Sequence, residues 1–182
     1  MKKHSGFTLI ELMMVCAVVG VLVVVTVPNM GDFIKNQRIK SQMFDFLNAL
    51  NIARSEAVKR KTPVAICSSA DLDSTPTCAA STNWATGYII FEDTNNDGTF
   101  TGGTDIVINL GNPLTGNNTF ISTGSSVRFQ TDGSTLGTTR FAICDNRTPE
   151  VDYGRQINIT MVGRASVEGG SGASISSCTA PS

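Results

Sequence analysis

The chain has 182 residues and a mass of 19.3 kDa, a size that predicts one domain with at most one appendage. Its formal net charge of −1 excludes a globally basic nucleic-acid binder and an acidic disordered tail. The chain has 1 histidine, His4, which argues against histidine-based acid–base catalysis and histidine-rich metal sites.

The first predicted element is an apolar helix over residues 7–28. Its polar or weakly polar positions are Thr8, Glu11, Cys16 and Thr26. A helix of this length covers roughly the 30 Å hydrocarbon core of a bilayer, and Lys2 and Lys3 before it predict a cytoplasmic N-terminus. A secretory signal peptide would have a shorter apolar run and a small-residue cleavage site. A plain membrane anchor would leave the carboxylate of Glu11 in lipid without a purpose.

The segment from Lys2 to Leu12 resembles the signal of type IV pilins and pseudopilins, in which a basic leader ends in glycine and Phe-Thr-Leu-Ile-Glu follows. In that family a prepilin peptidase cuts after the glycine and methylates the new N-terminus. The resemblance implies a cleaved leader over residues 1–6, with the cut between Gly6 and Phe7. It also implies that Glu11 neutralises the N-terminal amine of a neighbouring subunit, an attraction that low dielectric strengthens.

The helix is expected to continue over residues 29–62 as its periplasmic half. A stripe of apolar positions spaced 4, 3, 4, 3, 4 predicts packing against a sheet, and Phe44 and Leu47 widen it. The stripe consists of Ile39, Met43, Phe46, Leu50, Ala53 and Ala57. Thr62-Pro63 is expected to end the helix.

Residues 63–182 are predicted to form a β-rich domain. Short β-branched or aromatic segments bounded by Gly, Asn, Asp or Pro are typical of strands. They are Val64–Cys67, Gly87–Glu92, Asp105–Leu110, Ser126–Gln130, Arg140–Cys144, Gln156–Met161 and Arg164–Val167. The Gly/Ser-rich tail over residues 169–177 is expected to be flexible up to its anchor at Cys178.

Several segments are similar to the GspH/FimT branch of minor pilins. They are Ala53–Ala57, Gly87–Phe91 with Asp93 and the Asn-Asp-Gly loop after it, Phe141–Cys144, Gly154–Ile157 and Gly163-Arg164. The resemblance implies an α+β fold, in which a long N-terminal transmembrane helix continues into a periplasmic helix. That helix would pack on a small antiparallel β domain of two sheets.

Four of the 5 cysteines lie in the β-rich part: Cys67, Cys78, Cys144 and Cys178. An even number outside the cytoplasm predicts two disulfides, for which three pairings are open. We favour a local Cys67–Cys78 bond and a Cys144–Cys178 bond that anchors the tail. Zinc is the alternative, which the lack of a C-x2-C pair disfavours.

The segment Asp93–Gly98 matches the first half of a calcium loop, D-x-[DN]-x-[DN]-G. The twelfth position, where a calcium loop has a bidentate glutamate, is Thr104, with Asp105 one place later. An Asx-rich turn between two strands favours the same residues and is the preferred interpretation.

Gly163-Arg164-Ala165-Ser166 bears on DNA binding. FimT-like relatives that take up DNA carry Gly-Arg-x-Arg here, and Ser166 replaces the second arginine. Arg164, helped by Arg155, is the candidate DNA contact. Residues 62–127 contain no Lys or Arg, however, and few cations predict weak, salt-sensitive binding.

The sequence therefore predicts a minor pilin or pseudopilin, inserted once in the inner membrane with its C-terminal domain in the periplasm. It would start filament assembly at or near the tip of a type IV pilus or a type II secretion pseudopilus. Its expected partners are other pilins or pseudopilins, the prepilin peptidase and the inner membrane, with a DNA-uptake role as the alternative. No catalytic residues, metal, cofactor or small-molecule substrate are expected, since no nucleophile with a base can be found.

Overall fold

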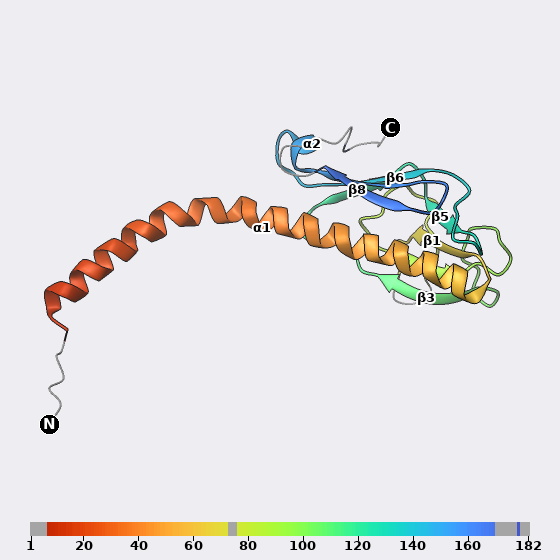
Figure 1. Cartoon of the computed structure of the whole chain (residues 1–182), viewed down its shortest axis with the longest axis horizontal. Coiled ribbons are helices and arrows are strands. Elements are labelled where there is room, and N and C mark those ends of the chain that lie inside the picture. Colours follow the sequence, from red (N-terminus) through yellow and green to blue (C-terminus); the bar gives the residue numbers. More distant parts are fainter. Residues whose placement is uncertain (1–6, 73–75, 170–177, 179–182) are drawn as a thin grey trace, which may run out of the picture. The chain divides into compact units, whose positions relative to one another are not determined.

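The computed structural model describes residues 7–72, 76–169 and 178, and it divides the chain into two units, Met1–Gln37 and Arg38–Ser182. Helix α1 (Leu9–Arg60) begins in the first unit and ends in the second (Figure 1). Among the described residues, no helix is both long and apolar enough to cross a membrane. The assignment of residues 7–28 to a membrane span stays a prediction.

Two antiparallel four-stranded sheets form most of the second unit (Figure 1). The first has the order β3-β2-β1-β5, from β1 (Val64–Ser68), β2 (Tyr88–Glu92), β3 (Ile106–Gly111) and β5 (Ser126–Phe129). The second has the order β4-β6-β7-β8, from β4 (Thr119–Ser122), β6 (Thr139–Cys144), β7 (Arg155–Ile159) and β8 (Ala165–Gly169). A short helix, α2 (Glu150–Tyr153), lies between β6 and β7. The expected α+β fold with two sheets is confirmed.

The sequence pattern located every strand except β4, and it missed α2. Strand β4 has four residues in a stretch rich in Gly, Asn, Ser and Thr, and only Phe120 in it is a large buried side chain. A segment this short carries little periodicity, so its pairing with β6 decides its conformation. Gly169, expected in the tail, is the last residue of β8, and residues 170–177 lie outside the described residues.

The core lies between helix α1 and the inner faces of both sheets. All members of the predicted stripe are buried, from Ile39 to Ala57. Phe46 joins the two sheets, since its ring lies 5.2 Å from that of Tyr88 in β2 and 4.7 Å from that of Phe141 in β6. Leu47 packs against this core, but Phe44 is 51% exposed, so the expectation that Phe44 widens the stripe is wrong. It follows Met43 by one residue, about 100° around the helix, and so faces solvent.

Candidate functional site

The predicted assembly segment forms the start of helix α1. Gly6 lies outside the described residues, and Phe7 is 79% exposed. Thr8 caps the helix, because its Oγ1 accepts a hydrogen bond from the backbone N–H of Glu11 at 3.3 Å. Thr8-x-x-Glu11 is the pattern of a capping box, and this pattern is a second signal in the sequence for a helix that starts here. The helix therefore begins two residues after the expected new N-terminus.

Glu11 is surrounded on its helix face by apolar side chains. Met14, Val15, Val18 and Val19 share this face with it, and all of the first helical turns are exposed in the isolated chain. Among the described residues Glu11 makes no ion pair. A carboxylate set in an exposed apolar surface is therefore available to a cation from another molecule.

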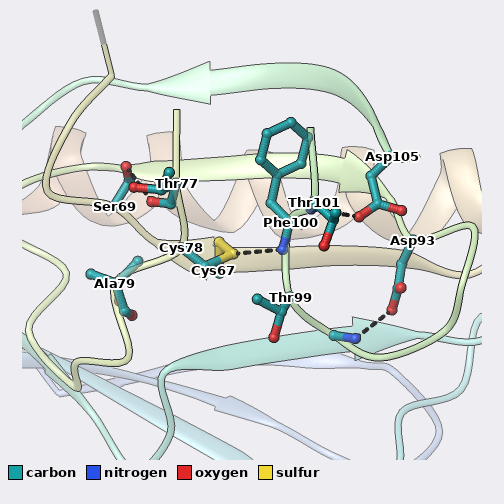
Figure 2. The surroundings of a disulfide bond; sticks show 12 residues. Cys67, Ser69, Thr77, Cys78, Ala79, Asp93, Thr99, Phe100, Thr101 and Asp105 are labelled. Carbon is teal, nitrogen blue, oxygen red and sulfur yellow. Dashed lines mark hydrogen bonds between the residues drawn. A yellow bond between two sulfur atoms is a disulfide. The ribbon is translucent and has the colours of Figure 1, made fainter. Parts of the chain in front are cut away.

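The Cys67–Cys78 disulfide lies on the outer face of the first sheet (Figure 2). Cys67 points away from the helix, and the backbone N–H of Phe100 donates a hydrogen bond to Sγ of Cys78 at 3.2 Å. The Phe100 ring lies edge-on to Phe91 of β2, with centroids 5.4 Å apart. The disulfide thus anchors two connections, after β1 and after β2, over this face.

The Cys144–Cys178 disulfide lies on the outer face of the second sheet. Cys144 ends β6, and both cysteines are buried with Ala142 in a small outer cluster beside Ile121. The two bonds are the pairs that the sequence favoured. They occupy all four thiols of the zinc alternative, and the described residues hold no cluster of three or more His, Cys, Asp or Glu suited to a metal ion.

The calcium-like loop is held together by its own backbone and one arginine. Asp93 is fully buried, and its Oδ1 and Oδ2 accept hydrogen bonds from the N–H groups of Asp97 (3.0 Å) and Gly98 (2.9 Å). Asp105 accepts from the N–H groups of Thr94 and Thr101. Arg128 Nη1 lies 3.5 Å from Asp93 Oδ2 and donates to the carbonyl of Asn96. The geometry supports the Asx-turn interpretation, with a guanidinium as the cation.

Two further arginines form ion pairs within the fold. Arg147 is buried, pairs with Asp145 at 2.7 Å and covers the ring of Tyr153. Arg60 bridges Glu56 and Glu92 of β2, and hydrogen bonds from Arg60 and Lys59 lower the pKa of Glu56.

Arg54 joins helix α1 to two turns, donating to the carbonyls of Gly133 and Val162 at 3.0 Å each. Its role was missed, because nothing in the spacing of a lone arginine on a helix shows which distant carbonyls it will meet.

The structure does not bring Arg155 and Arg164 together. In the register of the sheet Arg155 lies opposite Gly169 of β8 and Ile143 of β6. This position is at one end of the β7–β8 hairpin, on the face of the sheet that packs on the core. Arg164 is exposed at the turn of the same hairpin, at its other end. In the same register Arg140 lies opposite Asn158, and Asn158 lies opposite Ser166. The exposed side chain of Arg140 is therefore on the outer face of the sheet, the same face as Ser166.

Three features together define a pilin-like filament subunit. They are an N-terminal segment of the methylated type, a long helix, and two antiparallel sheets that each carry a disulfide on the outer face. Residues 1–27 match the family model described as the prokaryotic N-terminal methylation motif. Residues 44–163 match the model of the type II transport protein GspH. The chain belongs to the GspH family, within the superfamily of type IV pilins and pseudopilins, and it is a minor pilin or pseudopilin.

The chain is also similar to solved structures. Two crystal forms of the type IV minor pilin FimU of Pseudomonas aeruginosa are 22% and 24% identical, with TM-scores of 0.59 and 0.56. They cover 80% and 76% of this chain and 98% of their own. The minor pseudopilin EpsH of the Vibrio cholerae type 2 secretion system is 12% identical, with a TM-score of 0.49, covering 71% of this chain and 95% of its own. No curated protein sequence matches the chain.

Proposed function

We propose that the protein is inserted in the inner membrane through residues 7–28, with its β domain in the periplasm, and joins a filament at or near the tip to initiate assembly. The prepilin peptidase would first remove residues 1–6. The filament is a type IV pilus or a type II secretion pseudopilus. The protein acts through subunit contacts and carries out no reaction.

Glu11 is the observation that carries this proposal. Its carboxylate is exposed, unpaired among the described residues, and set beside Val15 and Val18 on an apolar face. Cleavage after Gly6 would place a positive amine on Phe7, four residues before Glu11. In a bundle of such helices, Glu11 of one subunit can neutralise the amine of its neighbour, and low dielectric makes each ion costly alone.

Replacement of Glu11 by Gln tests the proposal. The variant should enter the membrane normally, because it removes a charge from an apolar helix, but it should fail to enter sheared filaments. Glu168→Gln, which removes an exposed carboxylate from β8, is the matched control and should assemble normally. Normal incorporation of Glu11→Gln would refute the pairing role.

Gold labelling of a tagged subunit tests the tip position, because label spread along the filament would contradict it.

Processing has its own test. The mature protein should begin with N-methylated Phe7, because a small glycine precedes the cut and the helix starts at Leu9, just beyond it. Mass spectrometry of protein taken from membranes measures both changes. An intact Met1 in assembled subunits would contradict the processing scheme.

A second proposed role, in DNA uptake, is supported by the exposure of Arg140 and Arg164 near the turn of the β7–β8 hairpin. Phosphate contacts from so few cations would be insensitive to sequence and steeply dependent on salt. Gel shifts at low salt should show weaker binding for Arg164→Ala and stronger binding for Ser166→Arg. Arg155→Ala is the control that the geometry now provides, and no shift at about 50 mM salt would exclude the role.

A further inference from the structure

A hollow of about 330 Å³ opens in the second unit, where helix α1 faces the end of β3 and the loop after it. Phe46, Trp84 and Phe120, each fully buried, lie beneath it, and Tyr88 forms one wall. The filament role proposed above makes no use of this hollow.

The hollow is built by specific contacts. A Cβ atom at Gly111 would lie 2.0 Å from Cζ of Tyr88, so only glycine lets the ring lie where it does. Gln42 of α1 donates to the carbonyl of Thr115 at 3.0 Å and accepts from Nδ2 of Asn118 at 2.6 Å. These bonds hold the loop to the helix at the rim, which keeps the hollow open.

The side chains that line the hollow carry one negative charge, and the guanidinium of Arg38 lies against Gly116, one residue beyond the rim residue Thr115. Asp45 is the one ionisable acid or base at its rim besides Tyr88, it is exposed, and it makes no ion pair within the described part of the chain. Burial, and then the charge of Asp45, raise the pKa of Tyr88 to about 12. Residues 62–127, which supply most of the lining, contain no Lys or Arg. A ligand that complements this site has a cationic head and an apolar stem.

We propose that the hollow binds a lysine or arginine side chain presented by a neighbouring filament subunit. Such a side chain lays its methylene stem along apolar surface and carries its charge at the end, where Asp45 lies. Charge complementarity identifies a filament subunit as the source. Residues 29–61 of this chain have a net charge of +4 and expose Lys40, and a neighbour with a similar segment presents the same cations. The inference rests on the proposed function, because it needs neighbouring subunits.

The fluorescence of Trp84 reports directly on binding in the hollow, because the chain has a single tryptophan and it lines the hollow. The full-length protein in detergent micelles is titrated with N-acetyl-arginine amide, N-acetyl-lysine amide and, as a neutral control, N-acetyl-glutamine amide. The two cations should change Trp84 emission saturably, and Asp45→Asn should weaken binding about threefold or more, as loss of an exposed ion pair does. Glu168→Gln should bind as the wild type does. No saturation up to about 100 mM, or equal binding by Asp45→Asn, would overturn the site.

Incorporation into filaments tests the source of the cation. Asp45→Arg should reduce the amount of subunit in sheared filaments, and Asp45→Glu should retain it. If Glu11→Gln blocks incorporation while Asp45→Arg does not, the docking inference is overturned and the filament role stands. If cation binding in micelles is lost in Asp45→Arg but incorporation is unchanged, the ligand is a free organic cation and not a neighbouring subunit. If neither Glu11→Gln nor Asp45→Arg alters incorporation, both the docking inference and the pairing role of Glu11 are overturned. Absence of the wild-type subunit from sheared filaments would overturn the filament role itself.

Discussion

Arg128 Nη1 lies 3.5 Å from Oδ2 of Asp93. The Asp93 side chain is fully buried, and the Arg128 side chain is 19% exposed. The guanidinium comes from β5 and the carboxylate from the loop between β2 and β3, so the pair joins this loop to the first sheet. In a calcium loop a metal ion would neutralise this carboxylate. Here the chain supplies the positive charge itself.

Arg128→Gln should therefore destabilise the domain. The change leaves a buried carboxylate without its cation, which costs about 2–3 kcal/mol after a discount for the partial exposure of Arg128. Chemical denaturation followed by Trp84 fluorescence measures the loss. Arg140→Gln, which removes an exposed arginine from β6, should cost less than about 0.5 kcal/mol. Equal stability of the two variants would contradict the role given to Arg128.

Calcium should leave the melting temperature of the wild-type protein unchanged. All three carboxylates of the loop, Asp93, Asp97 and Asp105, already accept backbone N–H groups, and Arg128 adds a cation. Thermal denaturation with and without about 5 mM calcium tests this, since extracellular sites bind at about 0.1–1 mM. A clear rise in melting temperature would mean that the loop opens to hold the ion.

The two disulfides should contribute unequally to stability. The Cys67–Cys78 bond closes a separation of 11 residues and Cys144–Cys178 one of 34. Chain entropy then predicts that removing the bond that closes the longer loop lowers the free energy of unfolding by about 1 kcal/mol more. Denaturation of the two double-alanine variants measures the difference, and thiol titration of the native chain should find Cys16 alone. A larger cost for the shorter loop would show that the contacts of Phe100 outweigh loop entropy.

Most of the fold follows from local patterns in the sequence. The stripe from Ile39 to Ala57 predicted which face of α1 is buried, because a helix with one apolar face has one way to pack on a sheet. Strand β1 shows the limit of this reasoning. All of its residues are buried, since Val64 and Ile66 face the helix while Cys67 faces a covering loop. Only the folded chain shows which segment covers the outer face.

The arginines show the same limit for the candidate site. The sequence pattern linked Arg155 to Arg164, which lie nine positions apart, Arg155 at the start of β7 and Arg164 in the turn before β8. The register of β7 and β8 separates them, because Arg155 pairs with Gly169 and not with a residue near the turn. Partners of long polar side chains depend on which loops meet, and spacing along the chain does not determine that.

Gly163→Ala should destabilise the domain even though the residue belongs to the Gly-Arg segment that suggests DNA binding. Its φ of +73° is strained for alanine, and a Cβ atom would lie 1.9 Å from the carbonyl oxygen of Gly133. We expect a cost of about 2–4 kcal/mol in denaturation experiments. Gly137→Ala is the control, because its Cβ would meet nothing within 4 Å and its φ is not positive. A mild effect at Gly163 would show that the two turns separate easily.

Tyr88 should titrate at about pH 12, because burial disfavours the phenolate and the charge of Asp45 adds to this. In the unfolded chain Tyr88 releases its proton near pH 10. The contribution of the protonated Tyr88 to the free energy of unfolding is therefore complete below pH 10 and is lost as the pH rises toward 12. Phenolate absorbance against pH measures the titration, and the difference from Tyr88→Phe assigns it, since the chain has 2 tyrosines. Asp45→Asn should lower this pKa without restoring it to 10, because burial is the larger cause. Titration of Tyr88 near pH 10 in the folded wild type would contradict both the buried wall and the negative charge of the hollow.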